Sequence, residues 1–198
     1  MLSPLLFNIF LADLAKGLFS FSDKFELNRT KINSLFWADD IVLLAKSKEK
    51  LEDMLKYLSS YCSENKLTVN CKKTKCLIFN EGGRLIREKF YLNGNELENV
   101  REYKYLGFKL TASGEIKTGL KDLKDRALKA YFSLKNRMEV GFNQCVKTAL
   151  EVYKSIVQPI LLFTSDFWGV LKLPANNPVE TVQMRIFKDI LGVSKKTA

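Results

Sequence analysis

Histidine is absent from this chain of 198 residues. Its absence excludes Ser/His/Asp triads, His-based acid–base catalysis and His-ligated zinc sites. Cysteine is scarce, with four residues at irregular spacing and no C-x-x-C pair, which argues against a zinc site. We therefore expect Cys62, Cys71, Cys76 and Cys145 to be free thiols, mostly buried, in a reducing compartment.

Long uninterrupted apolar runs are also missing. The opening MLSPLLFNIFLADL lacks a basic segment and contains Pro4 and Asp13, and the later run IVQPILLFTSDFWGVL is interrupted by Pro159 and Asp166. Neither pattern is typical of a signal peptide or of a transmembrane span. We expect an intracellular protein of the cytoplasm or nucleus, neither secreted nor transmembrane.

Apolar residues and positive charge are plentiful. Hydrophobic residues make up 46% of the chain, enough for a packed core, and the formal net charge is +10. A surplus of that size favours a polyanionic partner, either nucleic acid or an anionic membrane surface. A basic but otherwise ordinary protein surface is the alternative.

The first part of the chain mixes helical and strand patterns. We expect a buried helix over 4–18 and an amphipathic helix over 48–64, capped by Ser47. The strand-like runs are 31–37, 41–45, 67–69, 75–79 and 102–110, and Asn93-Gly94 predicts a further tight hairpin. Runs 31–37 and 41–45 should form a hairpin whose turn carries Asp39 and Asp40, with both faces covered because the runs are apolar at consecutive positions.

The pattern becomes helical after Gly114. Helices are expected over 115–139, where a stripe from Leu120 to Met138 is apolar, and over 143–157 and 179–191. We place a domain boundary between residues 112 and 113, with an α+β part before it and an all-helical part after it.

The paired aspartates in LFWADDIVLL (residues 35–44) are unusual because apolar residues flank them on both sides. An Asp-rich turn alone would be unremarkable, since Asp favours turns. Two carboxylates at the end of a buried hairpin, however, repel each other unless a cation lies between them. Mg²⁺ is the natural candidate, because one or two carboxylates together with substrate phosphates hold it.

Four segments together resemble the reverse transcriptases of LINE-type, non-LTR retrotransposons. SLFWADDIVLLAKS is similar to their Ala-Asp-Asp form of the Tyr-x-Asp-Asp motif, and MLSPLLFNIFLADL to the helix under the template and incoming nucleotide. LTVNCKKTKCLIF resembles the next palm motif, and EYKYLGFKL the primer-grip strand. The stretch 115–198 resembles the helical thumb and connection, so the resemblance covers essentially the whole chain, from the middle of the palm through the thumb. It implies a partial polymerase palm, an antiparallel sheet with helices on one face, followed by an all-helical part.

The resemblance implies RNA-directed DNA polymerisation with two divalent ions, Mg²⁺ being expected, which activate the primer 3′-hydroxyl and stabilise the leaving pyrophosphate. Asp39 would be the direct metal ligand and Asp40 its weaker neighbour. The nucleotide- and template-binding residues would be Ser3, Pro4, Trp37, Ala38, Lys73 and Lys75, and the primer grip Tyr105, Leu106 and Gly107. For the lysines a solvated basic loop is an open alternative, as is a core strand with a glycine bulge for the primer grip.

This chain departs from the family pattern in two respects. Trp37 occupies a position where the family usually has Tyr or Phe, and the sequence begins inside the helical motif, without the upstream strand that carries the other essential carboxylate. We expect a truncated polymerase that is inactive alone, whose palm the missing N-terminal part would complete. Its expected partners are an RNA template with a DNA primer, or an RNA–DNA duplex, and no membrane.

The long helix predicted after Gly114 is strongly basic. Residues 117–137 contain seven basic side chains against Asp122 and Asp125. Lys117, Lys121, Lys124 and Lys129 are candidates for contact with a nucleic-acid backbone, and a solvated helix face is the alternative. A non-enzymatic nucleic-acid-binding module and a transposon relic without a selected role are therefore the competing interpretations of the whole chain.

Overall fold

The computed structural model describes residues 2–137, 145–171 and 177–193. Contacts within the chain divide it into two compact units. The first unit comprises residues 1–76 and 87–99, and the second comprises residues 77–86 and 100–198. The boundary expected between residues 112 and 113 remains a prediction.

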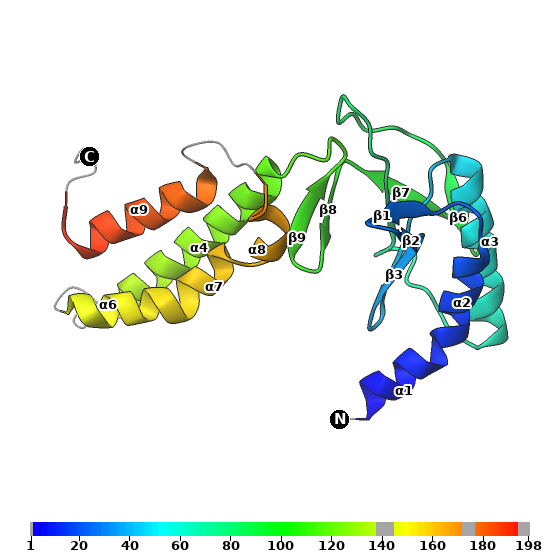
Figure 1. Cartoon of the computed structure of the whole chain (residues 1–198), viewed down its shortest axis with the longest axis horizontal. Helices are drawn as coiled ribbons and strands as arrows, with labels where there is room; N and C mark the ends of the chain where they lie inside the picture. The colour runs from blue at the N-terminus through cyan, green and yellow to red at the C-terminus, as the bar shows by residue number, and fades with distance from the viewer. Residues whose placement is uncertain (1, 138–144, 172–176, 194–198) are drawn as a thin grey trace. The chain divides into compact units, whose positions relative to one another are not determined.

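The first half of the chain contains both helices and short strands (Figure 1). In order they are α1 (Ser3–Phe10), α2 (Ala12–Ser20), β1 (Phe25–Leu27), β2 (Thr30–Ile32), β3 (Ser34–Trp37), β4 (Asp40–Leu43), α3 (Lys48–Glu64), β5 (Lys75–Leu77), β6 (Phe90–Leu92) and β7 (Asn95–Val100).

One hairpin and then helices make up the rest. They are β8 (Glu102–Tyr105), β9 (Phe108–Thr111), α4 (Lys117–Arg137), α6 (Val146–Val152), the π-helix η1 (Tyr153–Val157), α7 (Gln158–Leu161), α8 (Ser165–Trp168) and α9 (Pro178–Ile190). Within the described residues the strands form four small sheets, β1-β2, β3-β4, β5-β7-β6 and β8-β9. The pairs β1-β2, β3-β4, β6-β7 and β8-β9 are antiparallel. The predicted α+β class, antiparallel strands and helices followed by a helical part, is confirmed.

The apolar opening segment forms two helices instead of one. The chain turns at Leu11, between α1 and α2. On α2, Leu14 and Leu18 are buried, but α1 leaves Leu5, Leu6 and Ile9 exposed, Ile9 by 63%. The prediction of a buried helix was therefore wrong for α1, because an apolar sequence makes burial favourable but only a packed neighbour provides it.

Helices α2 and α3 pack closely in the first unit (Figure 1). A Cβ atom at Gly17 would lie 1.7 Å from the hydroxyl oxygen of Tyr57, so a larger residue at this crossing would displace the tyrosine ring. The predicted helix over 48–64 is confirmed, and the Ser47 hydroxyl accepts a hydrogen bond from the backbone N–H of Lys50 at 3.4 Å.

No strand forms at residues 67–69, where one was predicted. The backbone N–H of Leu67 donates to the carbonyl of Cys62 at 2.8 Å and Lys66 has a φ of 56°, so the end of α3 uses this donor. The strand predicted at 75–79 is shorter and ends at Leu77. The Asn93-Gly94 hairpin is confirmed, with φ of 51° and 76° at its two turn residues.

Asn33 interrupts the run that was predicted as a single strand over 31–37. Its side chain is fully buried and donates a hydrogen bond to the carbonyl of Leu18 at 2.6 Å. The backbone carbonyl of Asn33 accepts from Leu44 at 2.7 Å. These bonds separate β2 from β3 and fix the base of the β3–β4 hairpin to the end of α2.

The segment 102–110 is a hairpin and was wrongly predicted as one strand. Tyr105 pairs with Phe108, which leaves Leu106 and Gly107 as a two-residue turn with φ of 44° and 85°. The ring of Phe163 lies against this turn, 2.9 Å from the position that a Cβ on Gly107 would occupy. Gly107 is thus required both by its backbone angle and by the ring beside it.

The core of the second unit follows the predicted stripe of α4. Leu120, Leu123, Ala127 and Tyr131 are buried, and Leu134 is half-buried; Met138, the end of that stripe, lies outside the described residues. The buried residues of this stripe pack with α7, η1 and α9, which run along α4 in Figure 1. The helix predicted over 179–191 is confirmed as α9.

A buried tyrosine ties α4 to α9. The Tyr131 hydroxyl donates to Asp189 Oδ2 at 2.6 Å, and Lys135 Nζ lies 2.7 Å from the same oxygen. Burial, together with the Asp189 carboxylate, raises the pKa of Tyr131. Burial opposes ionisation of Asp189, but the hydrogen bonds from Lys135 and Tyr131 outweigh it and lower its pKa.

The helix predicted over 143–157 continues to Leu161. Residues 143 and 144 lie outside the described residues, and α6, η1 and α7 follow one another without a break. In the π-helix the N–H of Gln158 donates to the carbonyl of Tyr153, five residues back. This wider turn lets the helix continue past Pro159, which has no N–H and would clash with the preceding turn of a regular α-helix.

The four cysteines are free, as predicted, but only Cys62 and Cys76 are buried. Burial raises the pKa of the Cys76 thiol to about 11. None of the helices in the described part of the chain combines the length and the apolar character needed to cross a bilayer.

Replacing Asn33 with alanine is expected to destabilise the first unit by about 1–3 kcal/mol, because the buried carbonyl of Leu18 would lose its donor. Native-state hydrogen exchange of the α3 amides measures the change. Asn8→Ala, on the exposed face of α1, is the control and should have little effect. Equal protection in both variants would contradict a structural role for the Asn33 amide.

Gly107→Ala is expected to cost more than Gly114→Ala, although both glycines have left-handed backbones. A left-handed alanine costs roughly 1–2 kcal/mol at either position. Only Gly107 meets a ring, and overpacking adds roughly 1–3 kcal/mol there. Urea unfolding in a Trp37→Phe background, where Trp168 alone fluoresces, measures the difference. Equal losses would show that Phe163 moves aside freely.

Candidate functional site

The β3–β4 hairpin presents the paired aspartates. Trp37 pairs with Asp40, so the two-residue turn is Ala38-Asp39 and Asp40 is the first residue of β4. The prediction that both aspartates lie in the turn is corrected accordingly. Ala38, the first residue of the turn, has a φ of 52°, which is an unfavourable backbone conformation for a residue with a Cβ.

The two faces of the hairpin differ. Directly opposed residues share a face, so Asp40 lies on the face of Trp37, and Phe36 lies on the opposite face with Ile41. Trp37 is 65% exposed, and Leu35 is also exposed. The expectation that both faces are covered was wrong, since Trp37 and Leu35 are exposed.

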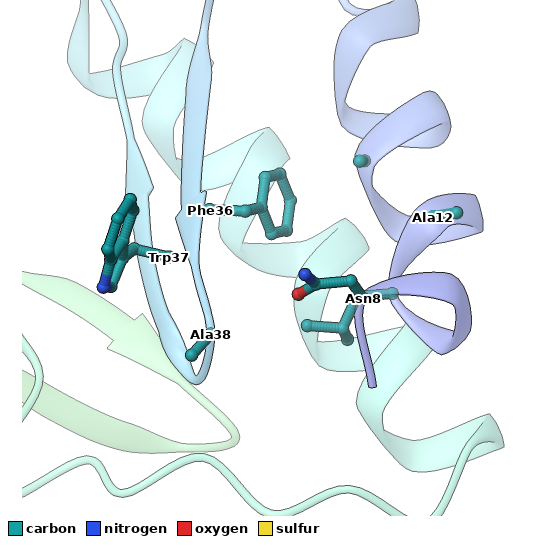
Figure 2. A pocket seen from close by; sticks show the side chains of 7 residues that line it. Asn8, Ala12, Phe36, Trp37 and Ala38 are labelled. Atoms are coloured by element: carbon teal, nitrogen blue, oxygen red, sulfur yellow. The ribbon is translucent and has the colours of Figure 1, made fainter. Parts of the chain in front are cut away.

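A pocket lies between the hairpin and the opening helices. Its lining is largely apolar and comes from the opening helices and from the hairpin: Asn8, Leu11, Ala12, Ala15, Phe36, Trp37 and Ala38. Figure 2 shows Phe36 pointing from the hairpin toward the helices beside Asn8, and Trp37 pointing to the other side. Two predicted site residues, Trp37 and Ala38, thus border this pocket, although the Trp37 ring points away from α1 and α2.

Sequence reasoning missed Asn8 and Phe36 as pocket residues. Asn8 is the one polar residue in the run LLFNIFL, which is a signal that could have identified it. The predicted residues Ser3 and Pro4 are the first two residues of α1.

The two predicted lysines occupy different surroundings. Lys73 is exposed in the turn that follows Asn70, whose carbonyl accepts from the Lys73 N–H at 3.0 Å. Lys75 begins β5 and forms an ion pair with Glu98 of β7, and its side chain is largely buried. Lys75 thus already has an anionic partner within the first unit, whereas Lys73 projects from a loop.

The carboxylates of Asp39 and Asp40 suit a hard cation by their chemistry. Both residues are exposed, and oxygen ligands are those that Mg²⁺ prefers. Within the described ranges, no group of three or more Asp, Glu, Cys or His side chains comes together. The pair fits part of a metal site, one in which the remaining ligands come from phosphates or from another carboxylate.

The other predicted residues belong to the second unit. Tyr105, Leu106 and Gly107 form the tip of the β8–β9 hairpin. The next residue pair along the strands consists of two opposed lysines: Lys109 Nζ lies 2.9 Å from Glu102 and Lys104 Nζ lies 3.7 Å from Asp122. The hydrogen bond to Glu102 raises the pKa of Lys109.

Helix α4 carries the predicted basic residues. Lys121 and Lys124 follow Lys117 by four and seven residues, so these three share one face. Lys129 is exposed too, and Asp125 lies one turn from both Lys121 and Lys129. Two of the seven basic residues counted in this segment have partners inside the unit instead: Arg126 pairs with Asp122 and Lys135 with Asp189. The basic surface of α4 is therefore smaller than the sequence suggests.

Comparison with known proteins gives a family match and two relatives. The family model "Reverse transcriptase (RNA-dependent DNA polymerase)" matches residues 1–110. A transposon-derived protein of Caenorhabditis elegans is 31% identical over 72% of this chain and 50% of its own length. The RNA-directed DNA polymerase from the mobile element jockey of Drosophila funebris is 25% identical over 96% of this chain.

The match to the jockey polymerase extends past the family model into the helical part, but it covers only 21% of that protein. The chain thus spans about half of one relative and about a fifth of the other. The paired aspartates, the pocket beside them and the β8–β9 hairpin all lie within or at the edge of residues 1–110. With more than half of its length matched by the family model, this chain belongs to the reverse transcriptase family of RNA-dependent DNA polymerases.

Proposed function

We propose that this chain supplies part of the polymerisation site of a LINE-type reverse transcriptase, with Asp39 as a metal ligand and Asp40 beside it. The observation that carries the proposal is the hairpin turn itself, where two exposed carboxylates directly follow Trp37 and Ala38, which border a largely apolar pocket. A divalent cation held there would supply charge stabilisation for the transferred phosphoryl group.

The residues around the turn can orient the substrates. Trp37 offers an exposed aromatic face on the side of Asp40, and such a face can stack on a nucleobase. Ser3 and Pro4, at the start of α1, and Ala38 would border the nucleotide and template. Lys73 is better placed than Lys75 to meet a triphosphate, because Lys75 is occupied by Glu98.

We propose further that residues 1–198 do not polymerise DNA on their own. The family resemblance implies a two-metal site that uses a further essential carboxylate besides the paired aspartates. In the described part of the chain no third acidic side chain joins Asp39 and Asp40. The further carboxylate would come from a polymerase segment outside these residues, which would also cover the apolar side chains that α1 exposes.

Duplex binding is assigned to the second unit. The primer would lie at Tyr105, Leu106 and Gly107, and the backbone of an RNA–DNA duplex would follow Lys117, Lys121, Lys124 and Lys129 on α4. The exposure of Lys117, Lys121 and Lys129 supports this assignment. The same surface would serve in the second candidate function, a nucleic-acid-binding module without catalysis.

The first test concerns the metal. Mn²⁺, used in place of Mg²⁺, should broaden the NMR signals of the turn residues 38–40 when a primer–template is present, and Asp39→Asn should abolish this broadening. Asp13→Asn on α2 removes an exposed carboxylate elsewhere in the first unit and should change nothing. Broadening that survives Asp39→Asn would refute a metal ligand at this position.

The same samples also test catalysis, with a labelled primer on an RNA template and all four deoxynucleotides. No extension is expected with the wild-type chain or with Asp39→Asn. Extension by the wild type alone would overturn the proposed lack of activity while supporting the role of Asp39.

The second test concerns the duplex. Binding of a fluorescent RNA–DNA duplex, followed by anisotropy, should weaken steeply with salt. Lys121→Gln should reduce the slope of log K against log salt by about 0.9, because one phosphate contact is lost. Lys154→Gln, an exposed lysine of the π-helix, is the charge-matched control and should leave the slope unchanged. Equal slopes for all three proteins would remove α4 from the binding surface.

A further inference from the structure

Arg126 of α4 holds the turn of the β8–β9 hairpin through a backbone carbonyl. Its Nη2 donates a hydrogen bond to the carbonyl of Gly107 at 2.9 Å, and its Nε lies 2.9 Å from Asp122 Oδ2. The guanidinium carbon is 5.9 Å from the centroid of the Phe163 ring, within reach of a cation–π contact. One guanidinium therefore contacts the hairpin turn, the helix surface and the α7–α8 segment.

Phe163 also contacts the turn. Its ring lies where a side chain on Gly107 would be, so both the ring and the guanidinium lie against this residue. The Asp122 carboxylate forms an ion pair with Arg126, and Lys104 of β8 adds a second cation to that carboxylate at 3.7 Å. Arginine suits this position because its planar fork donates in several fixed directions, which lysine cannot reproduce.

The hairpin is also held independently of Arg126, at Phe108, which directly follows Gly107 and pairs with Tyr105. Phe108 is buried in the core of the second unit, and a Cβ on Gly119 of α4 would lie 2.3 Å from its ring. Losing Arg126 should therefore loosen the tip without unfolding the unit. Arg126 is half-buried, whereas Leu106 at the tip is exposed, so the turn presents its own surface outward while its carbonyl is held from behind.

We propose that Arg126 is a positioning residue, which fixes the Leu106-Gly107 turn in the geometry needed to meet the primer end. The inference rests on the proposed primer contact of Tyr105, Leu106 and Gly107. It assigns Arg126 a role different from that of the exposed lysines on α4: Arg126 acts through the hairpin and does not itself bind the nucleic-acid backbone.

The experiment compares Arg126→Gln with Lys129→Gln in the full chain. Both substitutions remove one positive charge from α4 and introduce the same residue. Hydrogen exchange of residues 105–108 should accelerate about tenfold in Arg126→Gln, the effect of losing one hydrogen bond from a charged donor. It should not change in Lys129→Gln, and the α9 amides should be unaffected in both variants.

The second measurement uses a primer with a photoreactive group at its 3′ end, annealed to an RNA template at saturating concentration. Crosslinks should fall on residues 104–109 in the wild type and in Lys129→Gln, and should leave that segment in Arg126→Gln. Saturation removes the effect of affinity, so the crosslink position reports where the primer end lies. A purely structural role for Arg126 would not move it.

Each other result counts against the proposal. Unchanged exchange at the tip in Arg126→Gln would show that Arg126 does not hold the turn. Faster exchange with an unchanged crosslink would reduce Arg126 to a structural contact. If the wild-type chain binds no duplex, the proposed function fails and the positioning role with it. The exchange data would still show whether Arg126 holds the Leu106-Gly107 turn.

Arg126→Lys and Asp122→Asn keep the test decisive if Arg126→Gln fails to fold. Arg126→Lys retains the charge but not the fork, so tip exchange should still accelerate. A wild-type exchange rate in Arg126→Lys would show that charge alone is sufficient and would overturn the geometric argument.

Discussion

The buried amide of Asn33 is the constraint on which the first unit depends. The side-chain amide donates a hydrogen bond to the carbonyl of Leu18 in the last turn of α2. The backbone carbonyl of Asn33 accepts a hydrogen bond from the N–H of Leu44, which follows β4. A polar side chain in such surroundings is stable only in the orientation that satisfies its hydrogen bonds. The position of Asn33 therefore determines where the β3–β4 hairpin leaves the helices, and hence which face of that hairpin borders the cleft.

Turns explain most of what the sequence could and could not predict about the fold. Asn93-Gly94 was recognised because both residues tolerate positive φ and the dipeptide stands between strand-like residues. The Leu106-Gly107 turn was missed because its flanking residues look like one strand, and a leucine at a φ of 44° is an uncommon choice. The helices with clear apolar spacing, α3, α4 and α9, were predicted well, since periodicity alone specifies them.

The candidate site shows the same division between local and tertiary information. Adjacent carboxylates between apolar residues can be recognised from the sequence alone, so Asp39 and Asp40 could be identified as candidates. The pocket that Asn8 and Phe36 line together, and the ion pair between Lys75 and Glu98, depend on segments far apart in sequence. Counting charges likewise placed Arg126 on the surface of α4, although its donors turn toward the hairpin.

The π-helix at Tyr153–Val157 has a consequence for sequence history. A single wide turn inside an otherwise regular helix is what one inserted residue leaves behind when the flanking turns keep their register. The buried positions Ala149, Tyr153, Val157 and Leu161 keep facing the core at four-residue spacing across it. Relatives with an uninterrupted α-helix here should be one residue shorter between Val152 and Pro159, and an alignment of the family should place its gap at this turn.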